Sequence, residues 1–173
     1  MHAKNKISEK EKFSSIELIK LSCVWEGKLK IFLNDLGDQK DGSFFSPHPI
    51  DETSINQIVN VTGKDLYYLL VDKEEILGYG LLRGWDEGYH IPSLGIAIHP
   101  SARNIGLGRV FMFFLHSLAF QRGAAKVRLR VHQDNDKAIK LYKSLGYVFE
   151  IDKEQAFYLI GLKNIGSELF REL

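Results

Sequence analysis

The residues best suited to chemistry lie in a short glycine-containing segment between an apolar strand and a long helix. The strand ends at Ile96-Ala97-Ile98, and the segment reads Arg103-Asn104-Ile105-Gly106-Leu107-Gly108-Arg109. Backbone N–H groups at a helix start bind anions, and glycines let phosphate oxygens come close to them. The two arginines add charge-assisted donors. The pattern predicts a site for a phosphate-bearing ligand; the alternative is a tight strand-to-helix turn that binds nothing.

The same residues exclude two common phosphate-binding motifs. A Walker loop requires Gly-Lys followed by Ser or Thr, whereas Gly108 is followed by Arg109 here. The dinucleotide fingerprint requires a third glycine at position 111, which is Phe111. The ligand is therefore predicted to be neither a P-loop nucleotide nor a nicotinamide dinucleotide.

A second pattern follows the next predicted strand, Lys126–Val131. It consists of residues at helical spacing that end in a glycine: Asn135, Ala138, Leu141, Tyr142, Gly146 and Tyr147. Taken in this order over residues 94–149, the two patterns resemble the GNAT family of acyl-CoA-dependent N-acyltransferases.

The resemblance implies that acetyl-CoA is the cofactor. Its pyrophosphate would lie on segment 103–108, and its pantetheine arm between strand 96–98, which would bulge and splay, and strand 127–131. The Ile98 N–H would bind the thioester carbonyl oxygen, Asn135 would contact the pantetheine, and Tyr142 would protonate the leaving thiolate. The implied cofactor-binding set is Ile96, Ala97, Ile98, Arg103, Asn104, Ile105, Gly106, Leu107, Gly108, Arg109, Asn135, Ala138, Tyr142 and Lys143.

Two of these roles have simpler alternatives. Tyr142 could be a core tyrosine packed beside Leu141 and Leu145. Lys143, like Lys137 and Lys140, could be a solvated helix charge instead of a contact to the cofactor's 3′-phosphate or adenine.

The general base is open. Many family members use a glutamate near the start of the strand before the cofactor loop, but residues 90–95 (HIPSLG) contain no carboxylate. His48 is the candidate we name, because histidine titrates near neutrality and the resemblance puts its loop beside the acceptor. A loop histidine bonded to backbone is the alternative. His90, Glu87 and Asp86 are further candidates, each with a turn role as its alternative.

The acceptor is expected to be a small-molecule amine, such as an amino sugar or a polyamine. This expectation rests on the aromatic pair Phe44-Phe45 and on an acidic stretch upstream of the cofactor loop. Two alternatives stay open: a protein α-amine or lysine as acceptor, and a non-catalytic module that binds or senses acyl-CoA.

The elements that must position these residues alternate between strands and helices. Strands are expected near residues 13–21, 66–72, 76–85, 91–98, 126–131, 147–151 and 157–162, and helices near 25–36, 53–61, 107–121 and 135–145. The resemblance implies a single α/β domain of the α+β type over 1–173. About seven strands form a mixed sheet, splayed between the fourth and fifth and flanked by about four helices. Residues 1–12 are expected to be frayed, and 164–173 to form a tail.

Composition limits the classes of partner. The 173 residues carry a net charge of +1 and contain no apolar run near 20 residues, so we expect no nucleic acid, no membrane and a soluble cytoplasmic protein. The single cysteine, Cys23, excludes a disulfide framework, and we expect it to be a buried, inert thiol. No metal site is predicted, and a homodimer stays open.

The near-zero charge hides a division along the chain. Residues 51–98 carry three basic and eight acidic side chains (−5), whereas residues 99–143 carry nine basic and two acidic ones (+7). We expect the basic half to face the phosphate-bearing cofactor and the acidic half to border the amine acceptor. The alternative is charge scattered over solvated surfaces.

Overall fold

The computed structural model describes residues 13, 15–37 and 44–166 of the chain. Segment 1–12 and most of the 164–173 tail, for which we expected frayed and tail-like structure, lie outside these residues. The described part has the predicted fold class, a mixed seven-stranded sheet with four α-helices. None of its helices is long and apolar enough to span a bilayer.

The sheet consists of β1 (Ile16–Lys20), β2 (Leu66–Asp72), β3 (Glu75–Arg83), β4 (Ser93–Ile98), β5 (Lys126–His132), β6 (Val148–Ile151) and β7 (Tyr158–Asn164). Their spatial order is β1-β2-β3-β4-β5-β7-β6. Neighbouring strands are antiparallel except β4 and β5, which are parallel. The helix α3 (Leu107–Gln121) connects these two strands, as predicted for a strand-helix-strand unit.

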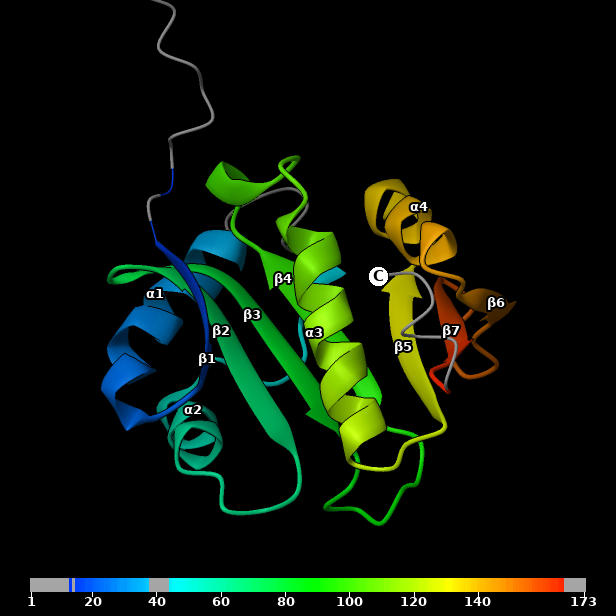
Figure 1. The fold of residues 1–173 in the computed structure, drawn as a ribbon, viewed down its shortest axis with the longest axis horizontal. Helices are drawn as coiled ribbons and strands as arrows, with labels where there is room; N and C mark the ends of the chain where they lie inside the picture. Colours follow the sequence, from blue (N-terminus) through cyan, green and yellow to red (C-terminus); the bar gives the residue numbers. More distant parts are fainter. Residues whose placement is uncertain (1–12, 14, 38–43, 167–173) are drawn as a thin grey trace, which may run out of the picture.

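β4 and β5 separate soon after they meet. Their ladder contains one residue pair, Ser93 with Arg128, beside a hydrogen bond from the Arg128 N–H to the Pro92 carbonyl (3.0 Å). Beyond this pair the two strands diverge (Figure 1). The splay predicted between the fourth and fifth strands is therefore present. It leaves the second half of β4 without a strand partner on the β5 side.

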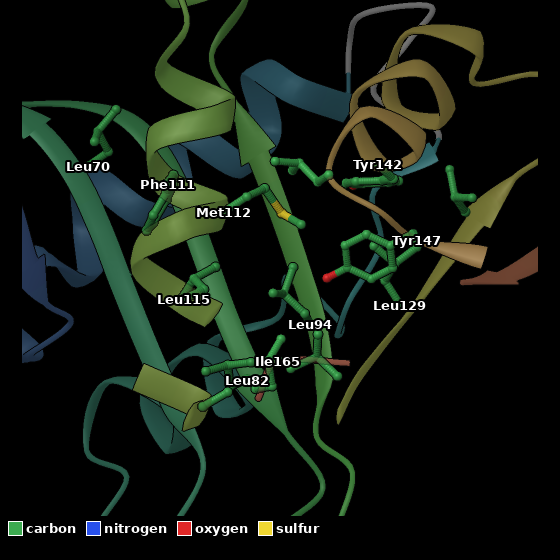
Figure 2. Packing of buried hydrophobic residues seen from close by; sticks show 14 of the residues in the cluster. Leu70, Leu82, Leu94, Phe111, Met112, Leu115, Leu129, Tyr142, Tyr147 and Ile165 are labelled. Carbon is green, nitrogen blue, oxygen red and sulfur yellow. The ribbon is translucent and has the colours of Figure 1, made fainter. Parts of the chain in front are cut away.

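Helices cover both faces of the sheet. α1 (Glu26–Gly37) and α2 (Glu52–Val59) lie on one face, and α3 and α4 (Asp136–Ser144) on the other (Figure 1). The apolar positions of α1 that recur at helical spacing are buried: Leu29, Phe32, Leu33 and Leu36. They pack with α2 and β2 in one core cluster. The second cluster joins α3 to α4 and β5, with Met112, Leu129 and Tyr147 at its centre (Figure 2).

Two local expectations are wrong. β4 does not bulge against β3, because the register between them is continuous from Ser93 to Ile98; the irregularity lies in β2, between Leu70 and Val71. Cys23 is exposed, not buried, because it lies in a short 3₁₀ turn before α1 from which its side chain faces solvent.

Candidate active site

Two cavities follow one another along β4. The first, of about 350 Å³, is lined by Ile96, Ala97 and Ile98, by the start of α3 and by α4. The second, of about 720 Å³, is lined by Ser93, Leu94 and Gly95 at the other end of the same strand. Phe44 and Phe45 line both cavities, so the two adjoin at these rings. We name them the α3 cavity and the β5 cavity.

The α3 cavity gathers most of the residues that the sequence assigned to the cofactor. Of the predicted set, all except Ile105, Leu107 and Lys143 line it. Lys137, which was named only as a contact to the 3′-phosphate or adenine, lines it as well. Residues from three separate segments, 96–98, 103–109 and 135–142, are therefore brought to one place.

The backbone at the start of α3 is shaped to bind an anion. Gly106 is the N-cap of α3, with φ of 91° and ψ of −8°, and Asn104 has φ of 65°. A side chain at Gly106 would meet nothing within 4 Å, so the surface there is open. The first N–H groups of an α-helix have no partner within the helix and carry its positive dipole end. A phosphate-bearing cofactor fits these residues.

The two arginines of this segment hold it to its neighbours. Arg103 Nε donates to the Ile98 carbonyl (2.9 Å), and Arg109 Nη2 donates to Ser144 Oγ of α4 (2.6 Å). Both arginines also line the α3 cavity, where a guanidinium offers charge-assisted donors to an anion. The arginines thus fix the loop between β4 and α4 and add positive charge to it.

The Ile98 N–H points toward the splay. His99 N–H donates to the Leu77 carbonyl of β3 (2.8 Å), and N–H directions alternate along an antiparallel strand. The Ile98 N–H therefore points away from β3. The Ile98 carbonyl points the same way and accepts a hydrogen bond from Arg103 Nε. An acceptor in the α3 cavity can reach this N–H.

α4 carries two of the predicted site residues. Asn135 is its N-cap: Asn135 Oδ1 accepts from the Ala138 N–H (3.2 Å), which leaves the amide Nδ2 as a donor. Tyr142 lines the α3 cavity but is only 8% exposed, and its ring lies 5.7 Å from that of Tyr147 (Figure 2). Burial raises the pKa of Tyr142 to about 12. Its hydroxyl therefore stays protonated, and remains a hydrogen-bond donor, at neutral pH.

His48 is not a lining residue of either cavity, although the preceding Pro47 lines the β5 cavity. Its Nδ1 bonds to the Pro49 carbonyl (2.9 Å), and its Nε2 to the hydroxyl of Tyr79 (3.0 Å). Burial lowers the pKa of His48. Both ring nitrogens are therefore engaged: Nε2 holds the loop to β3, and Nδ1 bonds within the loop.

The other candidate bases divide into two groups. His90 and Glu87 line the β5 cavity. The Asp86 carboxylate accepts hydrogen bonds from the N–H groups of Lys64 (2.7 Å) and Asp65 (3.2 Å). It therefore stabilises a turn, the role named as its alternative. An imidazole and a carboxylate are therefore available in the β5 cavity.

Cationic side chains in the β5 cavity were not anticipated. Three arginines line it: Arg83, Arg128 and Arg130. Among its described lining residues, Glu87 is the only acidic side chain. Most of the acidic stretch lies elsewhere: Asp65, for example, accepts from the backbone N–H groups of Gly84 and Trp85 (both 2.9 Å). The acidic half of the chain does border this cavity, through residues between Leu81 and Gly95, but Glu87 is the only carboxylate among the described lining residues.

Comparison with known proteins agrees with this geometry. The sequence model of the acetyltransferase (GNAT) family matches residues 32–147. The chain belongs to the GNAT family. An acetyltransferase from Pectobacterium atrosepticum is 30% identical over 83 residues, which are 48% of this chain and 57% of that protein. The chain thus spans little more than half the length of this relative.

Solved GNAT structures share the fold at low identity. The ribosomal-protein-S18-alanine N-acetyltransferase from Escherichia coli has a TM-score of 0.66 at 19% identity, over 87% of this chain and 94% of that one. The spermidine N-acetyltransferase from Vibrio cholerae, solved in complex with CoA and spermine, has a TM-score of 0.67 at 18% identity, over 85% and 92%. One of these names a protein acceptor and the other a small amine, so the shared fold does not decide the acceptor.

Proposed function

We propose that this GNAT protein transfers an acetyl group from acetyl-CoA to the primary amine of a small molecule by direct attack. The observation that carries the proposal is the pair of adjoining cavities along β4. The helix start and arginines of one cavity suit a phosphate-bearing thioester, and the other cavity is large enough for a small acceptor. Because they adjoin at Phe44 and Phe45, an amine in one lies next to an acyl group in the other.

In this proposal the α3 cavity holds acetyl-CoA. The start of α3 and the side chains of Arg103 and Arg109 bind the pyrophosphate. Asn135 Nδ2 contacts the pantetheine, and the Ile98 N–H donates to the thioester carbonyl oxygen, where negative charge develops during attack. No covalent bond to the protein is required.

Bound acetyl-CoA supplies the thioester: the N–C bond forms, the C–S bond breaks, and the sulfur takes the electron pair and finally the proton lost by nitrogen. The hydroxyl of Tyr142 donates to the leaving sulfur. A base must first remove a proton from the ammonium form of the acceptor. His90 and Glu87 are suited to this role because they line the β5 cavity; His48 would need to exchange its own hydrogen bonds first.

A binding measurement and a turnover measurement test the proposal together. Acetyl-CoA at 100 times its Kd should stabilise the fold by about 2.7 kcal/mol and raise the Tm. Release of free thiol should then depend on an added amine, measured with amino acids, amino sugars, polyamines and peptides. Absence of a Tm shift at saturating acetyl-CoA contradicts the cofactor assignment. Thiol release with peptides alone indicates a protein acceptor, and a Tm shift without thiol release indicates a silent binding module.

A further inference from the structure

The acceptor cavity of this protein is cationic. Arg83 reaches it from β3, and Arg128 and Arg130 from β5, whereas Glu87 is the acidic group among its described lining residues. A polyamine would meet repulsion here, because like charges in a partly enclosed cavity are screened less than at a free surface. The cavity is suited to a ligand that carries negative charge.

Two of the arginines are held in place by the chain itself. Arg83 Nη1 donates to the Pro47 carbonyl (2.8 Å). Arg130 Nε pairs with Asp152 Oδ2 (2.8 Å), and its guanidinium lies 4.0 Å from the centre of the Tyr158 ring. The charge of Arg130 is therefore largely balanced, and both side chains form fixed walls of the cavity.

Arg128 differs from these two. Lys126, Arg128 and Arg130 alternate with the buried residues of β5, so the three project from the same face of the strand. Within the described residues, the guanidinium of Arg128 has no hydrogen bond or ion pair. Its backbone forms the single pairing between β4 and β5, opposite Ser93 at the start of β4, whereas residues 96–98 at the other end of β4 line the α3 cavity. A guanidinium with free donors binds carboxylate or phosphate oxygens in a two-pronged geometry.

We propose that the acceptor carries an anionic group, a carboxylate or a phosphate, that Arg128 binds while the amine points along β4 toward the α3 cavity. This inference rests on the proposed function and narrows its acceptor to amines that also bear a negative charge. Phe44 and Phe45, where the two cavities adjoin, and Tyr89 of the β5 cavity would contact the apolar part of the molecule. The polyamines of the initial expectation are then poor substrates.

Matched amines test the inference in the thiol-release assay with acetyl-CoA. One pair is an L-amino acid and its amide, which differ in the carboxylate; the other is phosphoethanolamine and ethanolamine, which differ in the phosphate. We expect the anionic member of at least one pair to have a kcat/KM tenfold or more above that of its neutral partner. The pair that shows the preference identifies the anionic group.

Variants of β5 then assign the preference to one side chain. Arg128→Gln should abolish the preference within the pair, mainly through KM, and Arg128→Lys should restore part of it. Lys126→Gln is the matched control, because it removes a charge from the same face of β5 outside the cavity. The acetyl-CoA-induced Tm shift, measured for each variant, verifies that fold and cofactor binding persist.

The outcomes separate the two proposals. Turnover in which neutral amines or spermidine equal or exceed the anionic amines overturns this inference and leaves the acetyltransferase proposal intact. A preference that survives Arg128→Gln overturns the assignment to Arg128. Acetyl-CoA binding without turnover of any amine overturns the proposed function, and this inference with it.

Discussion

At the scale of single residues, the hydroxyl of Tyr142 is the group whose removal should affect chemistry more than binding. Its ring fills a buried place between α4 and the core, which phenylalanine can fill equally well. In the proposed reaction, Tyr142→Phe would remove the hydrogen-bond donor to the leaving sulfur. We expect kcat to fall about tenfold or more, with little change in the Kd for acetyl-CoA, measured by steady-state kinetics and calorimetry.

A matched variant and a pH profile support the test of Tyr142. Tyr68→Phe removes a hydroxyl from β2, outside both cavities, and should leave kcat unchanged. Because the pKa of Tyr142 is raised to about 12, its deprotonation should cause no loss of kcat between pH 7 and 10. Equal kcat values for Tyr142→Phe and the unchanged protein would assign the tyrosine to the core alone.

At the scale of elements, the two glycines at the start of α3 should respond differently to alanine. Gly106 has φ of 91°, which is costly for a residue with a Cβ, so Gly106→Ala should lower the free energy of unfolding by about 1–2 kcal/mol. A Cβ at Gly108 would meet Leu141 at 3.5 Å and Ile98 at 3.8 Å, both ordinary contacts. Gly108→Ala should therefore keep or slightly raise stability, since alanine favours the helix.

For acetyl-CoA affinity, in contrast to stability, Gly108→Ala should be harmful. Gly108 lines the α3 cavity, so the Cβ of Gly108→Ala would lie where the proposed function requires the pyrophosphate to approach the backbone closely. Its Kd for acetyl-CoA should rise about tenfold or more although the fold is intact, as measured by calorimetry beside chemical denaturation. An unchanged Kd for Gly108→Ala would move the phosphate site away from the start of α3.

Elements were predicted best where their signals are local. The bounds of α3 were predicted as 107–121 and found there, because an apolar run is followed by a turn at Gly123, with φ of 81°. The position of the Phe44–Pro49 loop could not be predicted in this way. It depends on contacts across the sequence: Phe44 stacks on His132 (5.0 Å) and Pro47 accepts from Arg83. No short-range pattern encodes them.

At the scale of the whole molecule, the division of charge along the sequence predicted the position of basic side chains but not that of acidic ones. The basic stretch does supply Arg103, Arg109 and Lys137 to the α3 cavity. The acidic stretch, however, serves structure: Asp51 caps α2, and Asp65 and Asp86 hold turns. Formal charge summed along a sequence cannot separate a carboxylate that faces a ligand from one that satisfies backbone N–H groups. The alternation of β5 was the better signal for the β5 cavity, but only the three-dimensional structure shows which face of the strand lines it.

A buried histidine of α3 bonds to Tyr147 within the core cluster that joins α3 to α4 and β5. His116 of α3 has no exposed surface, and its Nε2 lies 2.7 Å from the hydroxyl of Tyr147, which precedes β6. Its Nδ1 is buried without a partner among the described residues. Burial, with a smaller contribution from Lys163, lowers the pKa of His116 to about 4. The folded protein therefore holds this imidazole neutral.

This neutral histidine should make folding stability depend on pH. Below pH 6.5 His116 binds a proton in the unfolded chain, whereas in the folded chain it stays neutral down to about pH 4. The free energy of unfolding therefore has its full value above pH 6.5 and decreases as the pH falls from 6.5 to 4. The loss approaches about 1.4 kcal/mol per pH unit. In His116→Met, chemical denaturation at several pH values should show a smaller acid loss, despite lower stability at pH 7 from the unpaired Tyr147 hydroxyl. Parallel pH profiles for the variant and the unchanged protein would contradict a neutral buried imidazole.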